Sequence, residues 1–298
     1  MSTFEKPDRR DVMKWALASA SLPLVPQALG SVAAAQAKPE ATRQDRGSIA
    51  TLSSGLKLYY QEDWFGEPWL TPEPAVFLHG DLEKGEIWWG WVPRMAQHYR
   101  MIRIDLPGFG RSTVPSNYEW SHTNFAKGFS EFLDTIGAPS VHLIGAKTGG
   151  ALAMYYAATN PQRVRTLVVA SGPFSSVDPK MASSTQQVRL GSAASKEEMA
   201  YFDKLRDESS LATREAVQKM NSSFNLDALL PKITAPTLII TSDRSALQSV
   251  DTVLRNQVKI PNSRLLVLTS DAYHIAVAKA DECSANALAF MQQAKRQA

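Results

Sequence analysis

A lysine stands beside a tight turn in the middle of the chain, in the run Val141-His142-Leu143-Ile144-Gly145-Ala146-Lys147-Thr148-Gly149. The apolar residues before the turn indicate a buried strand, and the small residues after it indicate the start of a helix. An amine that burial has deprotonated can form a Schiff base with an aldehyde or ketone. An amine that stays charged can instead hold a carboxylate, phenolate or enolate. A third possibility is an inert ion pair with Asp81 or Glu83, in a protein that binds without catalysis.

Four further segments accompany this turn in a fixed order along the chain. They are Pro74-Ala75-Val76-Phe77-Leu78-His79-Gly80, Ile104-Asp105-Leu106-Pro107-Gly108-Phe109-Gly110-Arg111-Ser112, Ala235-Pro236-Thr237-Leu238-Ile239-Ile240 and Tyr273-His274. Taken together with the turn, they resemble the α/β-hydrolase family, whose nucleophile elbow reads Gly-x-Ser-x-Gly. The resemblance covers residues 48–295. It implies an α/β fold with a mostly parallel sheet flanked by helices and covered by a small helical cap.

The resemblance also implies roles for individual side chains. In the family a serine attacks, a histidine takes its proton and an acid orients the histidine. Here Lys147 occupies the serine position, Ser245 the position of the acid and His274 that of the histidine. A shift of one or two residues in register would make Asp243 the acid, and Asp81 is a third candidate. Two of the three side chains are therefore changed, which argues against an ordinary serine esterase.

Backbone groups and aromatic rings complete the predicted site. By the family pattern, the N–H groups of Asp81 and Thr148 stabilise the oxyanion. Trp88 and Trp89 are neighbours in a helical run and cannot share one face, so one of them can reach the pocket and stack on a ring-bearing substrate. The alternative is core packing beneath the loop. Since no cofactor or metal motif is found in the sequence, we expect neither a cofactor nor a metal.

Strands and helices alternate along most of the chain, as in a mostly parallel sheet covered on both faces. Between about residues 174 and 232 this alternation stops, and the stretch is far longer than an ordinary connection. We expect a helical cap there, with a surface excursion as the alternative. The other expected elements include strands at Ser48–Leu52, Leu56–Gln61 and Met101–Ile104, and helices at Glu83–Tyr99, His122–Ile136 and Ile275–Gln293.

The N-terminal segment, residues 1–37, is typical of an export signal. Arg9 and Arg10 precede a short apolar run, and Ala35-Gln36-Ala37 provides a small-residue cleavage site. The arginine pair favours the twin-arginine route. We therefore expect residues 38–298 to form one domain in the periplasm or outside the cell, which meets the membrane only during export. The alternative is a basic tail.

Composition limits the function. With 298 residues, 44% hydrophobic and 20% charged, the chain suits one globular domain. A net charge of +3 without a basic run argues against a nucleic-acid partner. We therefore predict a cofactor-free enzyme that acts on a small carbonyl-bearing or aromatic molecule through Lys147 and His274, with lyase-like or atypical hydrolase chemistry. The alternative is an inactive binding protein of the same fold.

Overall fold

The computed structural model describes residues 47–177 and 185–297. The predicted signal segment, residues 1–37, lies outside the described residues. So do residues 38–46 at the start of the predicted domain and residues 178–184 of the predicted cap.

An eight-stranded sheet forms the centre of the fold, with the strand order β1-β2-β4-β3-β5-β6-β7-β8. The first three strands of this order pair antiparallel, and all the remaining pairs are parallel. Parallel neighbours require crossovers, which the intervening helices supply. The strands are β1 (Gly47–Thr51), β2 (Lys57–Asp63), β3 (Pro74–Leu78), β4 (Arg100–Ile104), β5 (Val141–Ala146), β6 (Val164–Ala170), β7 (Thr237–Ser242) and β8 (Ser263–Leu268).

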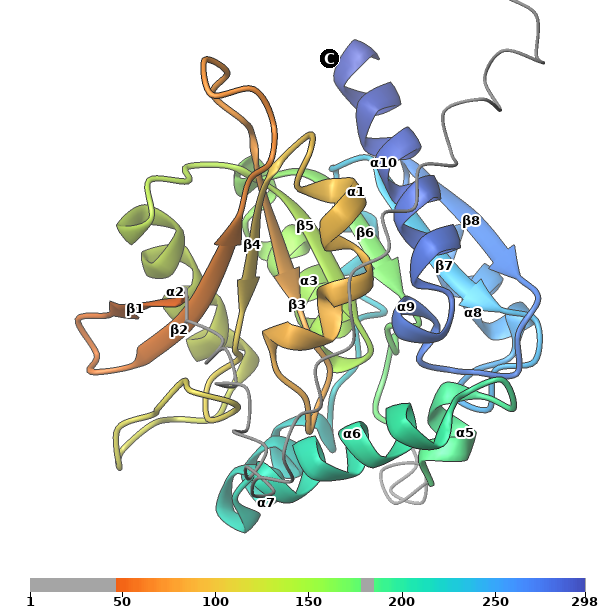
Figure 1. Ribbon diagram of the computed structural model, residues 1–298, viewed down its shortest axis with the longest axis horizontal. Coiled ribbons are helices and arrows are strands. Elements are labelled where there is room, and N and C mark those ends of the chain that lie inside the picture. Colours follow the sequence, from red (N-terminus) through yellow and green to blue (C-terminus); the bar gives the residue numbers. More distant parts are fainter. Residues whose placement is uncertain (1–46, 178–184, 298) are drawn as a thin grey trace, which may run out of the picture. The chain divides into compact units, whose positions relative to one another are not determined.

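Helices cover both faces of the sheet (Figure 1). One face carries α2 (His122–Thr135), α3 (Thr148–Thr159) and α8 (Val250–Gln257), whose apolar side chains join one buried cluster. The other carries the 3₁₀ helix η2 (Gly85–Gly90), α1 (Val92–Met95), α9 (Ile275–Ala278) and α10 (Ala280–Gln297), which contribute to a second cluster. Two short 3₁₀ helices, η3 (Pro161–Arg163) and η4 (Leu230–Lys232), lie in connections.

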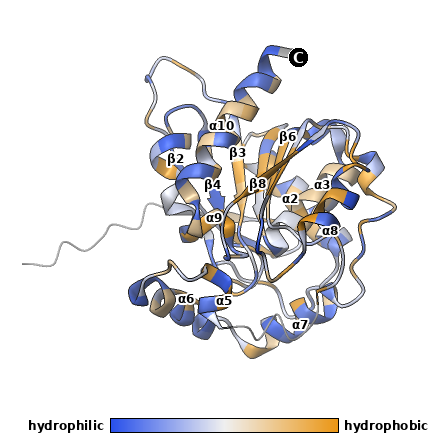
Figure 2. Ribbon diagram, turned by 90° about the vertical axis from the view of Figure 1, so that its right-hand side faces the viewer, coloured by the Kyte–Doolittle hydropathy of each residue, from blue (hydrophilic) through white to orange (hydrophobic). Residues whose placement is uncertain are grey.

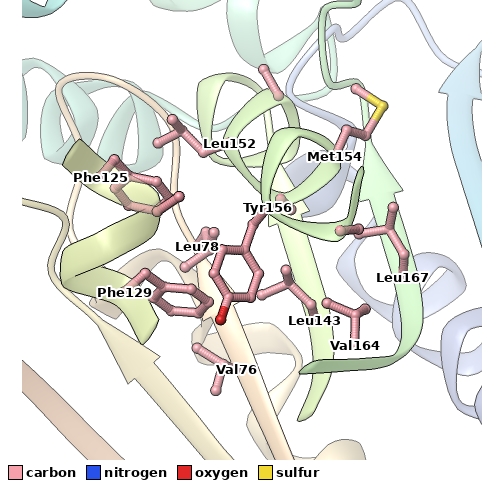
Figure 3. Close-up of a cluster of buried hydrophobic side chains, with 14 of the residues drawn as sticks. Val76, Leu78, Phe125, Phe129, Leu143, Leu152, Met154, Tyr156, Val164 and Leu167 are labelled. Carbon is pink, nitrogen blue, oxygen red and sulfur yellow. The ribbon is translucent and has the colours of Figure 1, made fainter. Parts of the chain in front are cut away.

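The sheet is held by the apolar side chains that alternate to its two faces. On the α2 side, Phe129 of α2 lies edge-on to Tyr156 of α3, with ring centroids 4.7 Å apart, above Val76 and Leu143 of the central strands (Figure 3). In Figure 2 the central strands β3 and β6 are mainly orange, whereas the helices show orange only in part. This pattern is what a buried sheet between amphipathic helices requires.

The stretch between β6 and β7 contains three helices, which lie together below the sheet in Figure 1: α5 (Gln186–Leu190), α6 (Lys196–Glu208) and α7 (Leu211–Asn221). A serine begins each of the two longer ones. The hydroxyl of Ser195 accepts a hydrogen bond from the N–H of Glu198, whose side chain accepts from the Ser195 N–H in return. Ser210 caps α7 through the N–H of Thr213. Such caps satisfy N–H groups that the first helical turn leaves unpaired.

The structure confirms the predicted fold class. Two expected helices differ in detail. Residues 83–99 form η2 followed by the short α1, because Pro93 fits only the first turn of a helix and starts a new one there. The expected helix from Ile275 is divided at Lys279, whose backbone is not helical. In the described part of the chain, no helix combines the length and apolar character needed to cross a membrane.

Candidate active site

Lys147 lies in the turn between β5 and α3, with a φ of +53°. A positive φ is uncommon for a residue with a side chain, and it turns the side chain of Lys147 out at the end of the strand. The turn is tight: a Cβ atom on Gly145 would lie 2.4 Å from the carbonyl oxygen of Gly149. A Cβ atom on Gly149 would in turn lie 2.3 Å from the carbonyl oxygen of His79. Both glycines are therefore required by close packing of backbone on backbone.

The loop that follows β3 faces this turn. Hydrogen bonds of two buried side chains, His79 and Asp105, hold this loop in place. Nδ1 of His79 donates to the carbonyl oxygen of Gly80 at 2.6 Å, and Nε2 accepts from the N–H of Leu106 at 2.8 Å. Burial lowers the pKa of His79 to about 4, which matches this neutral form. Asp105 accepts from the N–H of Gly85 at 2.7 Å, and burial raises the pKa of Asp105 to about 6. These bonds hold both ends of the loop in place.

Glu83, on this loop, joins the candidate residues. Its Oε1 accepts a hydrogen bond from Nζ of Lys147 and lies 3.0 Å from Nε2 of His274. Its Oε2 accepts from the N–H of Gly80 at 3.1 Å. The side chain of Glu83 is only 1% exposed. Burial alone would raise the pKa of Glu83, but His274 and the Lys147 ammonium outweigh it and hold the pKa below its ordinary value.

His274 is buried and in contact with the helices between β6 and β7. The backbone N–H of His274 donates to the carbonyl oxygen of Arg189 in α5 at 2.8 Å. The imidazole ring lies edge-on to the ring of Phe202 in α6, with ring centroids 5.7 Å apart. Burial lowers the pKa of His274, while the Glu83 carboxylate opposes this shift in part. At neutral pH the imidazole is therefore largely uncharged, and it is poised to accept a proton beside a carboxylate that would stabilise the resulting cation.

Asp81 lies beside the turn as well. The hydroxyl of Thr148 donates to its Oδ2 at 2.8 Å. Its Oδ1 is buried and has no hydrogen-bond partner among the described residues. Burial raises the pKa of Asp81, and the nearby Lys147 ammonium partly offsets that rise. Thr148 is the first residue of α3, so its N–H has no partner within the helix and is available to an anion.

The structure does not bring Asp243 or Ser245 to the histidine. Asp243 accepts from the N–H of Ser270 at 2.9 Å, and Ser245 accepts from the N–H of Leu247 at 3.2 Å. Among the described residues, Glu83 is the one carboxylate within ion-pair distance of His274. From the sequence, Glu83 was predicted only as a partner of Lys147. Its position three residues after the His-Gly turn was the available signal that it also faces His274.

The two adjacent tryptophans, Trp88 and Trp89, have different environments. Trp88 is fully buried and lies edge-on to Phe77 and Trp91, with centroids 5.1 and 5.2 Å away, so it belongs to the core. Trp89 is 42% exposed and lies edge-on to Tyr201 of α6 at 5.6 Å. A small cavity lies next to the turn, between α7 and the loops that follow the carboxyl ends of the strands. Neither tryptophan lines it. It is lined by Asp81, Leu106, Pro107, Phe109, Tyr118, Trp120, Phe125, Thr148, Leu152, Val217 and Met220.

This fold and this turn define the class of the protein: the chain has the α/β-hydrolase fold. Residues 74–213 match the profile of the alpha/beta hydrolase fold family. The crystal structure of a hydrolase from Pseudomonas aeruginosa PA01 superposes with a TM-score of 0.72 at 19% identity, covering 85% of this chain and 99% of that one.

Curated relatives are hydrolases too. The chain is 37% identical over 99 residues to a pimeloyl-[acyl-carrier protein] methyl ester esterase of Aeromonas hydrophila. That match spans 33% of this chain and only 37% of the esterase, about a third of its length. The chain is also 26% identical over 254 residues to a poly(3-hydroxyalkanoate) depolymerase of Ectopseudomonas oleovorans, covering 78% of this chain and 88% of that protein.

Proposed function

We propose that this protein is a cofactor-free enzyme that acts on a small carbonyl-bearing or aromatic molecule, with Lys147, Glu83 and His274 as its reacting groups. The observation that carries the proposal is the contact of one buried carboxylate with both the elbow lysine and the histidine. The similarity to hydrolases supports an enzyme. The substitution of lysine at the serine position argues for chemistry other than serine ester hydrolysis.

Lys147 acts in this proposal as a charge rather than as a nucleophile. Nζ of Lys147 is engaged in an ion pair with the buried Glu83 carboxylate, so it is not free to attack a carbonyl carbon. The ammonium lies next to the N–H of Thr148, at the position where an α/β-hydrolase stabilises an oxyanion. It can therefore hold the enolate, phenolate or alkoxide that forms when a bond beside a carbonyl breaks.

His274 and Glu83 move the proton. The neutral imidazole takes a proton from the substrate or from water, and the Glu83 carboxylate stabilises the imidazolium. In this arrangement Glu83 stabilises the imidazolium from the Nε2 side, and the position of the family acid holds the uncharged Ser245. The result is lyase-like or atypical hydrolase chemistry with no acyl-enzyme, since an amide on Lys147 would be a dead end.

A binding protein of the same fold is the second candidate, and one observation favours it. The three side chains lie within ion-pair distance of one another through Glu83 and are nearly inaccessible, with Lys147 9% exposed and Glu83 and His274 1% exposed each. A closed ion pair of this kind can serve structure alone.

Borohydride trapping separates the roles of the lysine. The protein is incubated with a panel of aldehydes and ketones, and turnover and the mass of the Lys147 peptide are both followed. We expect at least one compound to be consumed, with no reductive adduct on Lys147. The exposed Lys204 gives the background of nonspecific modification. An adduct on Lys147 above that background would replace the electrostatic role with a covalent one. If no compound is consumed while ligands raise the unfolding temperature, the protein is the binding protein.

We also propose export by the twin-arginine route, on the basis of Arg9, Arg10 and the cleavage site Ala35-Gln36-Ala37. Replacing Arg9 and Arg10 with lysine is expected to leave the precursor in the cytoplasm, as cell fractionation would show. The matched control is Lys6→Arg, which changes a basic residue outside the pair and should not affect export. Export of the double variant through the general secretory pathway would contradict the assignment.

A further inference from the structure

The cavity beside the elbow is apolar except at one end. Its walls include Leu106, Phe109 and Trp120 on one side and Val217 and Met220 of α7 on the other. Asp81 and Thr148 line it on the side of the candidate site, and Tyr118 is a further lining residue with a hydroxyl group. Such a cavity favours a ring-shaped apolar ligand, because flat rings pack well against aromatic walls.

Asp81 presents an acceptor at the polar end. Thr148 occupies Oδ2, and Oδ1 is buried without a hydrogen-bond partner in the described part of the chain. A buried acceptor without a donor is costly, so a ligand that brings a donor to Oδ1 gains more than one that does not. The same atom therefore distinguishes a ring with a donor from a plain hydrocarbon ring.

Charge near Asp81 limits the kind of donor. Lys147 of the elbow and Arg189 of α5 are both close enough to stabilise its carboxylate. The Glu83 carboxylate acts on Asp81 in the opposite sense and itself pairs with Lys147, so both signs of charge are already present here. A cationic donor would lose its hydration on entering this buried place, whereas an uncharged hydroxyl can donate to Oδ1 at a smaller desolvation cost.

We propose that Asp81 determines substrate specificity, with its Oδ1 accepting a hydrogen bond from a hydroxyl group on an aromatic ring held in this cavity. The inference rests on the proposed function, because it places that ring against Thr148, the residue that follows Lys147. The open space in the cavity is about 20 Å³, close to that of one water molecule. Binding of a ring therefore requires the walls of the cavity to move apart.

The test compares two probes of nearly equal shape, phenol and toluene, by titration against the full chain. We measure the ratio of their affinities, because this ratio cancels effects on the apolar walls. Asp81→Leu is expected to reduce the preference for phenol roughly 10-fold, the weight of a hydrogen bond to a charged group. Asp81→Asn keeps an acceptor for Thr148 and should give an intermediate ratio; it also serves if Asp81→Leu does not fold. Asp251→Leu, on the exposed surface of α8, is the control and should leave the ratio unchanged.

The outcomes separate this inference from the proposed function. An equal ratio in the wild-type protein and both Asp81 variants would overturn the role of Asp81, as would wild-type protein that binds neither probe. Neither result depends on turnover. Conversely, the protein could show a phenol preference that depends on Asp81 and yet consume no carbonyl compound. That result would support the role of Asp81 in binding and contradict the proposed enzymatic function.

Discussion

Replacing Glu83 with alanine is expected to lower the free energy of unfolding by roughly 3–5 kcal/mol. The variant leaves the Lys147 ammonium buried without the carboxylate with which it pairs. It also removes the acceptor of the Gly80 N–H and so loosens the loop. Urea denaturation of the wild-type and variant proteins at neutral pH measures the difference.

Two controls show that the loss comes from the buried pair. Glu62→Ala removes the carboxylate of a partly exposed ion pair with Arg100 and should cost only about 0.2–1 kcal/mol. Combining Glu83→Ala with Lys147→Met removes both charges, and the double variant should be more stable than Glu83→Ala alone. If Glu83→Ala costs no more than Glu62→Ala, the pair does not hold the site together.

The fold could be predicted from the sequence because positions where two backbone segments pack closely accept only glycine. Gly145 and Gly149 are glycines since a Cβ at either position would meet backbone oxygen, and no neighbour can yield there. The run Val141–Ala146 is fully buried and reads as continuous apolar sequence. Local rules of this kind identify the elbow and the sheet without knowledge of long-range contacts.

The site was less accessible to sequence reasoning, because its contacts depend on how far a loop reaches. Both Asp81 and Glu83 follow the His-Gly turn, and only the conformation of residues 80–85 decides which of them faces His274. That conformation depends on Asp105, which holds the N–H of Gly85 from a distant strand end. Trp88 and Trp89 show the same limit. Their adjacency in the sequence predicts that their side chains point in different directions, but it does not say which is buried. The contact with Phe77 places Trp88 in the core.

Removing the amine from the elbow is expected to have the largest effect on activity. Lys147→Ala should lower kcat on any substrate found by roughly 10²–10³, the usual weight of one oxyanion-stabilising group. Lys147→Arg keeps a cation but changes its reach and geometry, so it should retain more activity than alanine. Steady-state kinetics on folded variants measure both. Unchanged turnover in Lys147→Ala would make the lysine structural.

Lys147→Ser tests whether the scaffold can return to serine chemistry. A triad uses one nitrogen of its histidine for the nucleophile and the other for the acid. In this chain the carboxylate of Glu83 lies at Nε2, and Nδ1 of His274 has no hydrogen-bond partner among the described residues. The single variant should therefore show little hydrolysis of ester substrates, since loss of the orienting acid costs a triad about 10⁴-fold. Adding Ser245→Asp should leave esterase activity at the level of Lys147→Ser, because Ser245 makes a local contact with Leu247 and does not contact His274. High esterase activity in the single variant would instead show that Glu83 already orients His274 as an acid does.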